Sequence, residues 1–205
     1  MEDFYKLQQQ DRDRIGVVLD QAFQDDPVFN AIFEGATPEQ RIAFYTSPVV
    51  YCMKYGQVIA PSKQLEGMAA WVTGKHADMS MFHMLMSGAF FSAMKMGPKY
   101  SQRMATVFKP VDEDRKANMK GRDYIYLVMI GVDPQHQGQG LGGKLMRAVI
   151  TESEQSGLPV YLETETEENV SLYQHFGFEV IKKVSLPLID LPMWEMIREP
   201  NGLVS

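Results

Sequence analysis

A glycine-rich loop between an apolar strand and an amphipathic helix most constrains what this chain can fold into. The apolar run at 124–132 predicts a strand, the pattern at 141–154 predicts a helix, and four glycines lie at 138–143. Glycines let the main chain approach a ligand closely, and a helix N-terminus presents N–H groups to an anion. The segment therefore predicts a binding site for a phosphate-containing ligand.

Two phosphate-binding patterns fit this loop incompletely. Gly138, Gly140 and Gly143 match the dinucleotide pattern G-x-G-x-x-G, and Glu163 lies at a suitable distance for a ribose carboxylate. However, residues 133–137 separate the strand from the glycines, and little chain remains to complete a doubly wound sheet. Residues 138–144 also spell the start of a nucleotide-triphosphate loop. Leu145 then stands where that loop needs a Ser or Thr for magnesium.

A third pattern, Q/R-x-x-G-x-G/A, is complete. Gln137, Gly140 and Gly142 form it, directly after a strand that ends in Val-x-Pro. A second motif, Asn-Val-Ser-Leu-Tyr-Gln-His-Phe-Gly-Phe, follows the predicted strand 160–164. Its Asn169 and Tyr173 are four residues apart and share one face of a short helix predicted at 169–175. Asn169 is suited to bind a ligand or to cap that helix.

Together the two motifs resemble those of the GNAT N-acetyltransferase superfamily, clearly over residues 124–178 and more weakly around Trp71. The motifs look most similar to the branch that contains puromycin acetyltransferase. The resemblance implies one α/β domain over residues 1–205. In that domain a mixed, mostly antiparallel sheet is flanked by helices, with a helical insertion before the central strand. It also implies acetyl-CoA as the donor and a primary amine as the acceptor, which attacks the thioester directly.

The resemblance carries specific roles onto residues of this sequence. It implies that the Val132 backbone pairs with the amide-bearing arm of acetyl-CoA like an added strand, while loop N–H groups hold the pyrophosphate. It implies that the strands ending near Val132 and Glu163 splay apart to form the cofactor slot. The complete set expected to bind acetyl-CoA is Ile130, Val132, Gln137, Gly138, Gln139, Gly140, Leu141, Gly142, Gly143, Asn169 and Tyr173.

Acetyl transfer also requires groups that move protons. By resemblance, the Tyr173 hydroxyl protonates the departing thiolate. Glu163 is the first candidate to accept the amine proton, directly or through water, and Tyr126 is the second. A non-catalytic acyl-CoA-binding sensor or interaction module is the alternative function, because the identity of the base stays open.

Composition limits the other function classes. A net charge of −6 without a Lys/Arg cluster argues against a nucleic-acid partner. Cys52 is the only cysteine, so an intrachain disulfide and a paired-cysteine zinc site are excluded. It lies on the apolar face of a predicted helix. The histidines lack metal-site spacing, so no metal is expected; they are His76, His83, His136 and His175.

The apolar stretch 79–94 is too short to span a bilayer and predicts a buried helix. No secretory signal is recognised at the N-terminus, so we expect a cytoplasmic protein without a membrane partner. The region 76–118 is predicted to be helical and is rich in Met. We expect these Met side chains to pack in the core, in preference to forming an acceptor pocket. The sequence defines neither the acceptor nor the oligomeric state, and a homodimer is compatible with it. The remaining predicted elements are helices at 11–23 and 37–55 and strands at 57–62, 67–73, 178–186 and 191–197.

Overall fold

The computed structural model of the protein describes residues 3–201. Residues 1–2 and 202–205, the two ends of the predicted domain, lie outside the described residues. The strands are β1 (Tyr5–Lys6), β2 (Gly56–Ala60), β3 (Gly67–Thr73), β4 (Ile125–Val132), β5 (Val160–Thr164), β6 (Glu179–Leu186) and β7 (Leu191–Arg198). The helices are α1 (Arg12–Ala22), α2 (Pro27–Ile32), α3 (Pro38–Tyr55), α4 (Met81–Ser87), α5 (Ala89–Met96), α6 (Pro98–Asn118), α7 (Leu141–Ser156) and α8 (Glu167–His175). Short 3₁₀ turns lie at Gln9–Asp11, Gly74–His76 and Pro134–His136.

Within residues 3–201, seven strands form one sheet in the order β1-β2-β3-β4-β5-β7-β6. The β4–β5 pair is parallel and the other neighbouring pairs are antiparallel. The predicted mixed, mostly antiparallel sheet is therefore confirmed. The doubly wound parallel sheet that a dinucleotide fold requires does not match this order.

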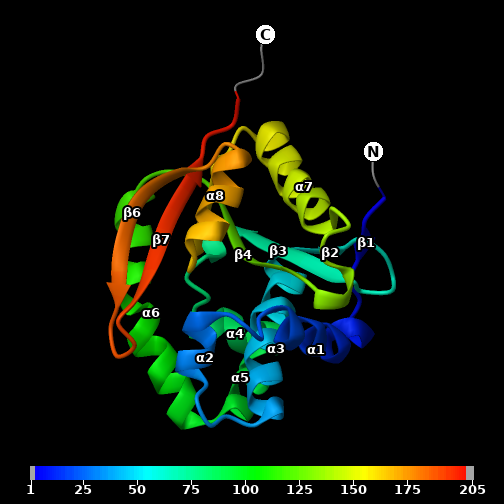
Figure 1. The fold of residues 1–205 in the computed structure, drawn as a ribbon, viewed down its shortest axis with the longest axis vertical. Helices are drawn as coiled ribbons and strands as arrows, with labels where there is room; N and C mark the ends of the chain where they lie inside the picture. Colours follow the sequence, from blue (N-terminus) through cyan, green and yellow to red (C-terminus); the bar gives the residue numbers. More distant parts are fainter. Residues whose placement is uncertain (1–2, 202–205) are drawn as a thin grey trace.

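Helices cover both faces of the sheet (Figure 1). The helices α7 and α8 pack on one face, and α1 to α6 lie on the other. Side chains of β5 alternate between the two layers, as expected for a strand. Tyr161 enters the core on the side of α1 and α3, whereas Leu162 packs with Leu145 of α7.

The start of α3 follows the sequence pattern that predicts it. The Thr37 hydroxyl accepts from the Gln40 N–H, and the Gln40 side chain accepts from the Thr37 N–H. This reciprocal pair is a capping box, with Pro38 at the first helical position. Cys52 lies on the buried face of the same helix, as predicted, and burial raises the pKa of its thiol.

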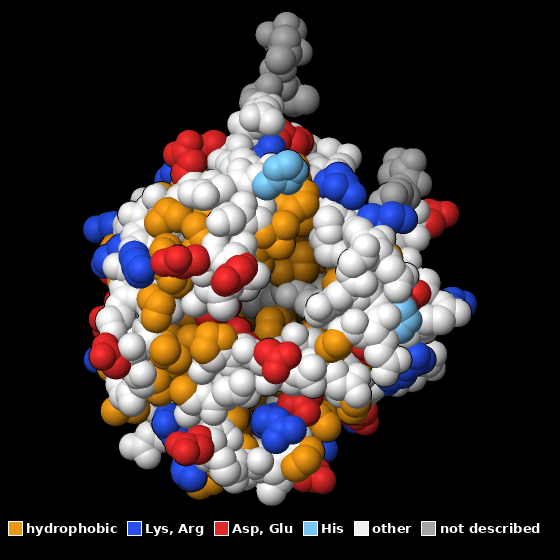
Figure 2. All heavy atoms as spheres, viewed as in Figure 1, with side chains coloured by type: hydrophobic (Ala, Val, Ile, Leu, Met, Phe, Trp, Pro, Cys, Tyr) orange, Lys and Arg blue, Asp and Glu red, His pale blue; other side chains and the backbone are white. Residues whose placement is uncertain are grey.

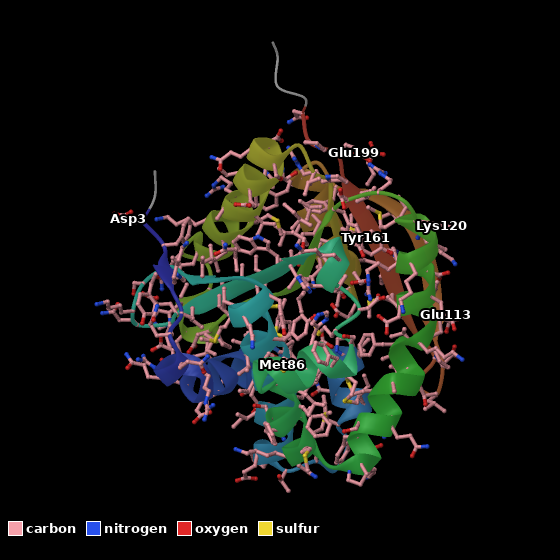
Figure 3. The ribbon with its side chains drawn as sticks, turned by 180° about the vertical axis from the view of Figure 1, so that it is seen from behind. Asp3, Met86, Glu113, Lys120, Tyr161 and Glu199 are labelled. Carbon is pink, nitrogen blue, oxygen red and sulfur yellow. The ribbon has the colours of Figure 1, made fainter. Side chains whose placement is uncertain are left out.

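The helical prediction for the Met-rich region is confirmed, but the region forms three helices. Gly88 and Gly97 separate them with φ of +85° and +82°. The prediction that 79–94 is a buried helix is wrong, because α4 and α5 form the outermost layer over α3. Met86 on α4, labelled in Figure 3, is 53% exposed, and Met94 on α5 is 61% exposed. Met96 does enter the core.

One extra residue in β4 shapes the centre of the sheet. Ala70 of β3 faces Met129, but the next residue, Trp71, faces Leu127, so Val128 is a β-bulge. A bulge bends its strand and disrupts pairing locally. Among the described residues β4 pairs with β5 at two positions, Ile125–Val160 and Tyr126–Tyr161, although both strands continue further. The two strands therefore diverge beyond Tyr126, as the resemblance implies.

Candidate active site

A cavity of about 560 Å³ opens where β4 and β5 diverge. Figure 2 shows a hollow near the middle of this face, with apolar side chains on its floor and acidic side chains at its rim. The β4 residues 127–132 form one wall, and the first turn of α7 together with α8 closes one side. The other side is closed by residues 22–29, from the end of α1 into α2.

Most of the residues predicted to bind acetyl-CoA come together in this cavity. Seven of them line it: Ile130, Val132, Gln137, Gly142, Gly143, Asn169 and Tyr173. The other four lie beside it, in the glycine loop and at the first position of α7: Gly138, Gly140, Gln139 and Leu141. The cavity therefore contains residues from both sequence motifs, which are separated by α7 and β5.

The glycine loop has the geometry of an anion cradle. Gly138 and Gly140 have φ of +75° and +78°, and a Cβ added at either would meet no atom within 4 Å. Gly140 is the N-cap of α7, so the first N–H groups of that helix have no partner within the helix. The Gln137 side chain donates to the Val132 carbonyl at 3.1 Å and ties the loop to the strand end. The loop thus combines open space with N–H donors, which fits a pyrophosphate.

The structure assigns the cap of α8 to a different residue than the sequence suggested. Thr166 is the N-cap, and its hydroxyl accepts from the Asn169 N–H at 3.2 Å. The hypothesis that Asn169 caps this helix is therefore wrong. Asn169 lies in the first turn of the helix and lines the cavity, as does Tyr173 one turn further on.

Tyr173 stays a protonated phenol at neutral pH. Its ring packs against Phe178, with centroids 5.8 Å apart, and its surface contributes to the cavity. Burial raises the pKa of the hydroxyl, and the charge of Glu165 raises it further. A proton donor is therefore held in the cavity.

Glu163 is a buried carboxyl group in the cavity wall. Its side chain is 9% exposed, and its Oε1 accepts from Nη1 of Arg115 at 3.3 Å. Burial raises the pKa of Glu163 to about 7, while the Arg115 charge and a hydrogen bond from Tyr126 oppose that rise. Such a carboxyl group can accept a proton near neutral pH. Tyr126, the second candidate base, lies outside the cavity lining, and burial raises its pKa well above its usual value.

Three further carboxylates of the cavity were missed by sequence reasoning: Asp25, Asp26 and Glu165. Burial raises the pKa of Glu165 to about 8, and the charge of Asp26 raises it further. Asp26 also caps α2, where its Oδ1 accepts from the Phe29 N–H at 2.8 Å. Among the described residues that line the cavity there is no Lys, Arg or His. The spacing of two between Glu163 in β5 and Glu165 directly after it was a usable signal, but nothing in the sequence placed Asp26 opposite them.

A family model matches the part of the chain that contains both sequence motifs. Residues 106–180 match the family model described as the acetyltransferase (GNAT) domain. An uncharacterized N-acetyltransferase of Schizosaccharomyces pombe is 29% identical over 205 residues, covering 96% of this chain and 83% of the relative.

Solved structures show the same fold. A histone acetyltransferase HPA2 and related acetyltransferase from Corynebacterium glutamicum superposes with a TM-score of 0.64 at 18% identity, over 98% of both chains. A putative arylalkylamine N-acetyltransferase 7 of Aedes aegypti gives a TM-score of 0.67 at 12% identity, over 96% of this chain and 86% of the other. The narrower resemblance to the puromycin acetyltransferase branch stays a prediction. Residues 106–180 of the chain therefore match the GNAT acetyltransferase domain, and the chain has the GNAT fold.

Proposed function

We propose that this protein transfers the acetyl group of acetyl-CoA to a primary amine. The observation that carries the proposal is the cavity between β4 and β5, whose two sides differ in chemistry. One side presents the glycine loop and the N-terminus of α7, which suit the anionic end of acetyl-CoA. The other side presents carboxylates, which suit an amine that arrives as a cation.

The edge of β4 supports the same donor. Beyond Tyr126, β4 has no β5 partner among the described residues, so its backbone groups on that edge are available, except the Val132 carbonyl, which accepts from Gln137. An extended arm with amide groups can pair there like an added strand. In this proposal Ile130 and Val132 bind that arm, and residues 137–143 bind the pyrophosphate.

The proposed reaction uses two protein groups in sequence. The thioester supplies the acetyl carbonyl, and the neutral amine nitrogen forms the new C–N bond as the C–S bond breaks. Glu163 accepts the proton that the amine nitrogen loses, directly or through water. The Tyr173 hydroxyl donates a proton to the departing sulfur. The ammonium group loses its extra proton to water before attack, and Glu163 returns its proton to Tyr173 through solvent after the CoA thiol forms, so the proton balance closes.

Small amines are the proposed acceptor class. The Aedes aegypti structure is named for arylalkylamines, which are such amines. The cavity of this chain has aromatic side chains, Phe23 and Phe29, beside the carboxylates Asp26 and Glu165. This combination favours a cation with an apolar body.

Turnover against a panel of amines tests the proposed function. Purified protein is incubated with acetyl-CoA and a panel of arylalkylamines, diamines, amino acids and peptides, and the release of CoA thiol is followed. We expect turnover with at least one cationic amine and least turnover with acceptors that carry a carboxylate. Binding of acetyl-CoA without turnover on any amine would instead favour the non-catalytic module.

Gly142→Glu tests the donor side of the cavity. Gly142 is helical, and a Cβ there would approach only the Val132 Cγ2, at 3.8 Å, so the substitution is compatible with the fold. The new carboxylate would stand at the end of α7 that favours anions and would repel the phosphates. We expect the Kd of acetyl-CoA, measured by calorimetric titration, to rise at least about tenfold, or ~1.4 kcal/mol. Thr151→Glu, which adds the same charge further along α7, should leave the Kd unchanged. Equal affinities in the two folded variants would contradict the assignment.

Glu165→Gln tests the acceptor side. A bound ammonium group favours the charged form of Glu165, which burial alone disfavours. Removing the carboxyl group should therefore raise the KM of a cationic amine by roughly three- to tenfold, because this charge-assisted contact is lost. The Kd of acetyl-CoA should stay the same. Glu168→Gln, in an exposed position of α8, is the matched control. An unchanged KM would remove Glu165 from acceptor binding.

A further inference from the structure

Arg115 of α6 reaches the candidate active site from the helical insertion. It lies in the part of α6 between Glu113 and Lys120, which Figure 3 labels along the edge of the molecule. Its side chain is 3% exposed, which is rare for an arginine. A buried guanidinium needs nearly complete hydrogen bonding and a compensating charge.

The guanidinium is fixed from several directions. Its Nη1 donates to Glu163 Oε1 at 3.3 Å, and its Nη2 donates to Asp112 Oδ1 at 2.7 Å and to the Ala77 carbonyl at 3.4 Å. Its Cζ lies 4.3 Å from the centroid of the Tyr126 ring, in a cation–π contact. The planar fork of arginine makes these contacts at once, which the single ammonium group of lysine cannot do.

Only one of the carboxylate partners of Arg115 belongs to the cavity. The Asp112 and Asp78 side chains are 52% and 53% exposed, whereas Glu163 is 9% exposed. Water screens the charges of the exposed Asp112 and Asp78, so their ionisation depends little on Arg115. Glu163 is shielded from water, so its ionisation depends most on the Arg115 charge. Of the three, Glu163 alone lines the cavity.

Several charged or titratable groups face Glu163. They are Arg115 and Asp112 from α6, Tyr126 from β4 with Tyr124 directly before it, and Tyr161 from β5 with Glu165 directly after it. Burial favours the neutral acid, and Asp112 acts in the same direction. Arg115 supplies the positive charge that opposes them. Without the guanidinium, burial would leave Glu163 protonated at neutral pH, where it could not accept a proton.

We infer that Arg115 is a positioning residue that orients the Glu163 carboxylate toward the cavity and keeps it in its charged form. This inference rests on the proposed role of Glu163 as the proton acceptor. In this inference the helical insertion before β4 contributes to the active site, because Arg115 of α6 contacts Glu163 of β5. No local sequence pattern distinguishes Arg115 from the other charged residues of α6.

The pH profile of kcat/KM tests the inference. In Arg115→Met the pKa of Glu163 should rise, so the acid limb of the profile should move upward by about one pH unit or more. The rate at neutral pH should fall by about tenfold, whereas part of it should return at higher pH. Arg115→Lys keeps the charge without the fork and should move the limb less. Arg122→Met, which removes an exposed ion pair with Glu199, should not move it.

A titration without turnover separates this inference from the proposed function. Protein with ¹³C-labelled glutamate carboxyl groups is titrated by NMR, and the Glu163 signal is identified by its loss in Glu163→Gln. We expect this signal to titrate at higher pH in Arg115→Lys, and further still in Arg115→Met where that variant folds. An unchanged Glu163 titration in folded Arg115→Lys and Arg115→Met, even with a lower Tm, would overturn the inference. A shifted titration in a protein without amine turnover would uphold the Arg115 effect and reject the proposed function instead.

Discussion

Glu163→Gln is expected to lower kcat/KM for the best amine by about 10²- to 10³-fold at and above neutral pH. Wild-type kcat/KM should fall with decreasing pH below about 7, because protonation of Glu163 removes the acceptor of the amine proton. The glutamine cannot titrate, so this acid limb should disappear from the variant. The measurement is a pH series of initial rates at low amine concentration.

The size of the Glu163→Gln effect must be separated from loss of folding. Glutamine can still accept from Arg115, which keeps the contact geometry but loses the charge. A matched control is Glu152→Gln on the exposed side of α7, which should leave the profile unchanged. A variant that keeps both the rate and the acid limb would assign proton acceptance to another group.

Tyr173→Phe is expected to lower the single-turnover rate by about 10²-fold while the Kd of acetyl-CoA changes little. The substitution removes only the hydroxyl, so the ring still packs against Phe178. The departing sulfur must then leave as a thiolate or take its proton from water. Rapid-quench kinetics isolates this step from product release.

Tyr5→Phe provides a matched control for Tyr173→Phe. It removes a hydroxyl that bonds to Asp11, far along the chain from both motifs, and should leave the rate unchanged. An unchanged single-turnover rate in Tyr173→Phe would remove its role as the acid. A large loss of acetyl-CoA affinity with an unchanged rate would assign Tyr173 to binding alone.

The sequence predicted the second half of the fold well because its elements carry strong periodic patterns. The strand β4, the loop, α7 and β5 follow one another with clear apolar runs, and β5 begins and ends where it was predicted. The six-residue α2 was missed, although Asp26 and Pro27 form a typical helix start. Short elements contain too few residues for periodicity to show.

The divergence of β4 and β5 is a property of strand pairing that local sequence does not reveal. It follows the bulge at Val128, which is defined only by the register of β4 against β3. The resemblance to the GNAT superfamily implied this divergence, whereas the apolar pattern of 124–132 did not. The same limit explains the exposed Met81, Met86 and Met94, since no local pattern says that α4 and α5 form the outermost layer.

The cavity was predicted in part. Both motifs contribute the expected residues, because spacing of four on a helix and a loop before a helix are local features. The residues that sequence reasoning missed come from three separate parts of the chain: Asp26 directly before α2, Glu165 directly after β5 and Arg115 within α6. In the sequence these residues look like ordinary exposed charged residues, and only the folded structure shows that they lie close to β4 and β5.

Calorimetric titration of the purified protein with acetyl-CoA tests the central claim most directly, with NADH and ATP–magnesium as controls. We predict saturable binding of acetyl-CoA, weakened in Gly142→Glu, and no binding of either control at the same concentrations. Binding of NADH or ATP–magnesium without binding of acetyl-CoA would contradict the account, because the glycine loop would then hold a different phosphate ligand and the roles proposed for Glu163 and Tyr173 would lose their basis.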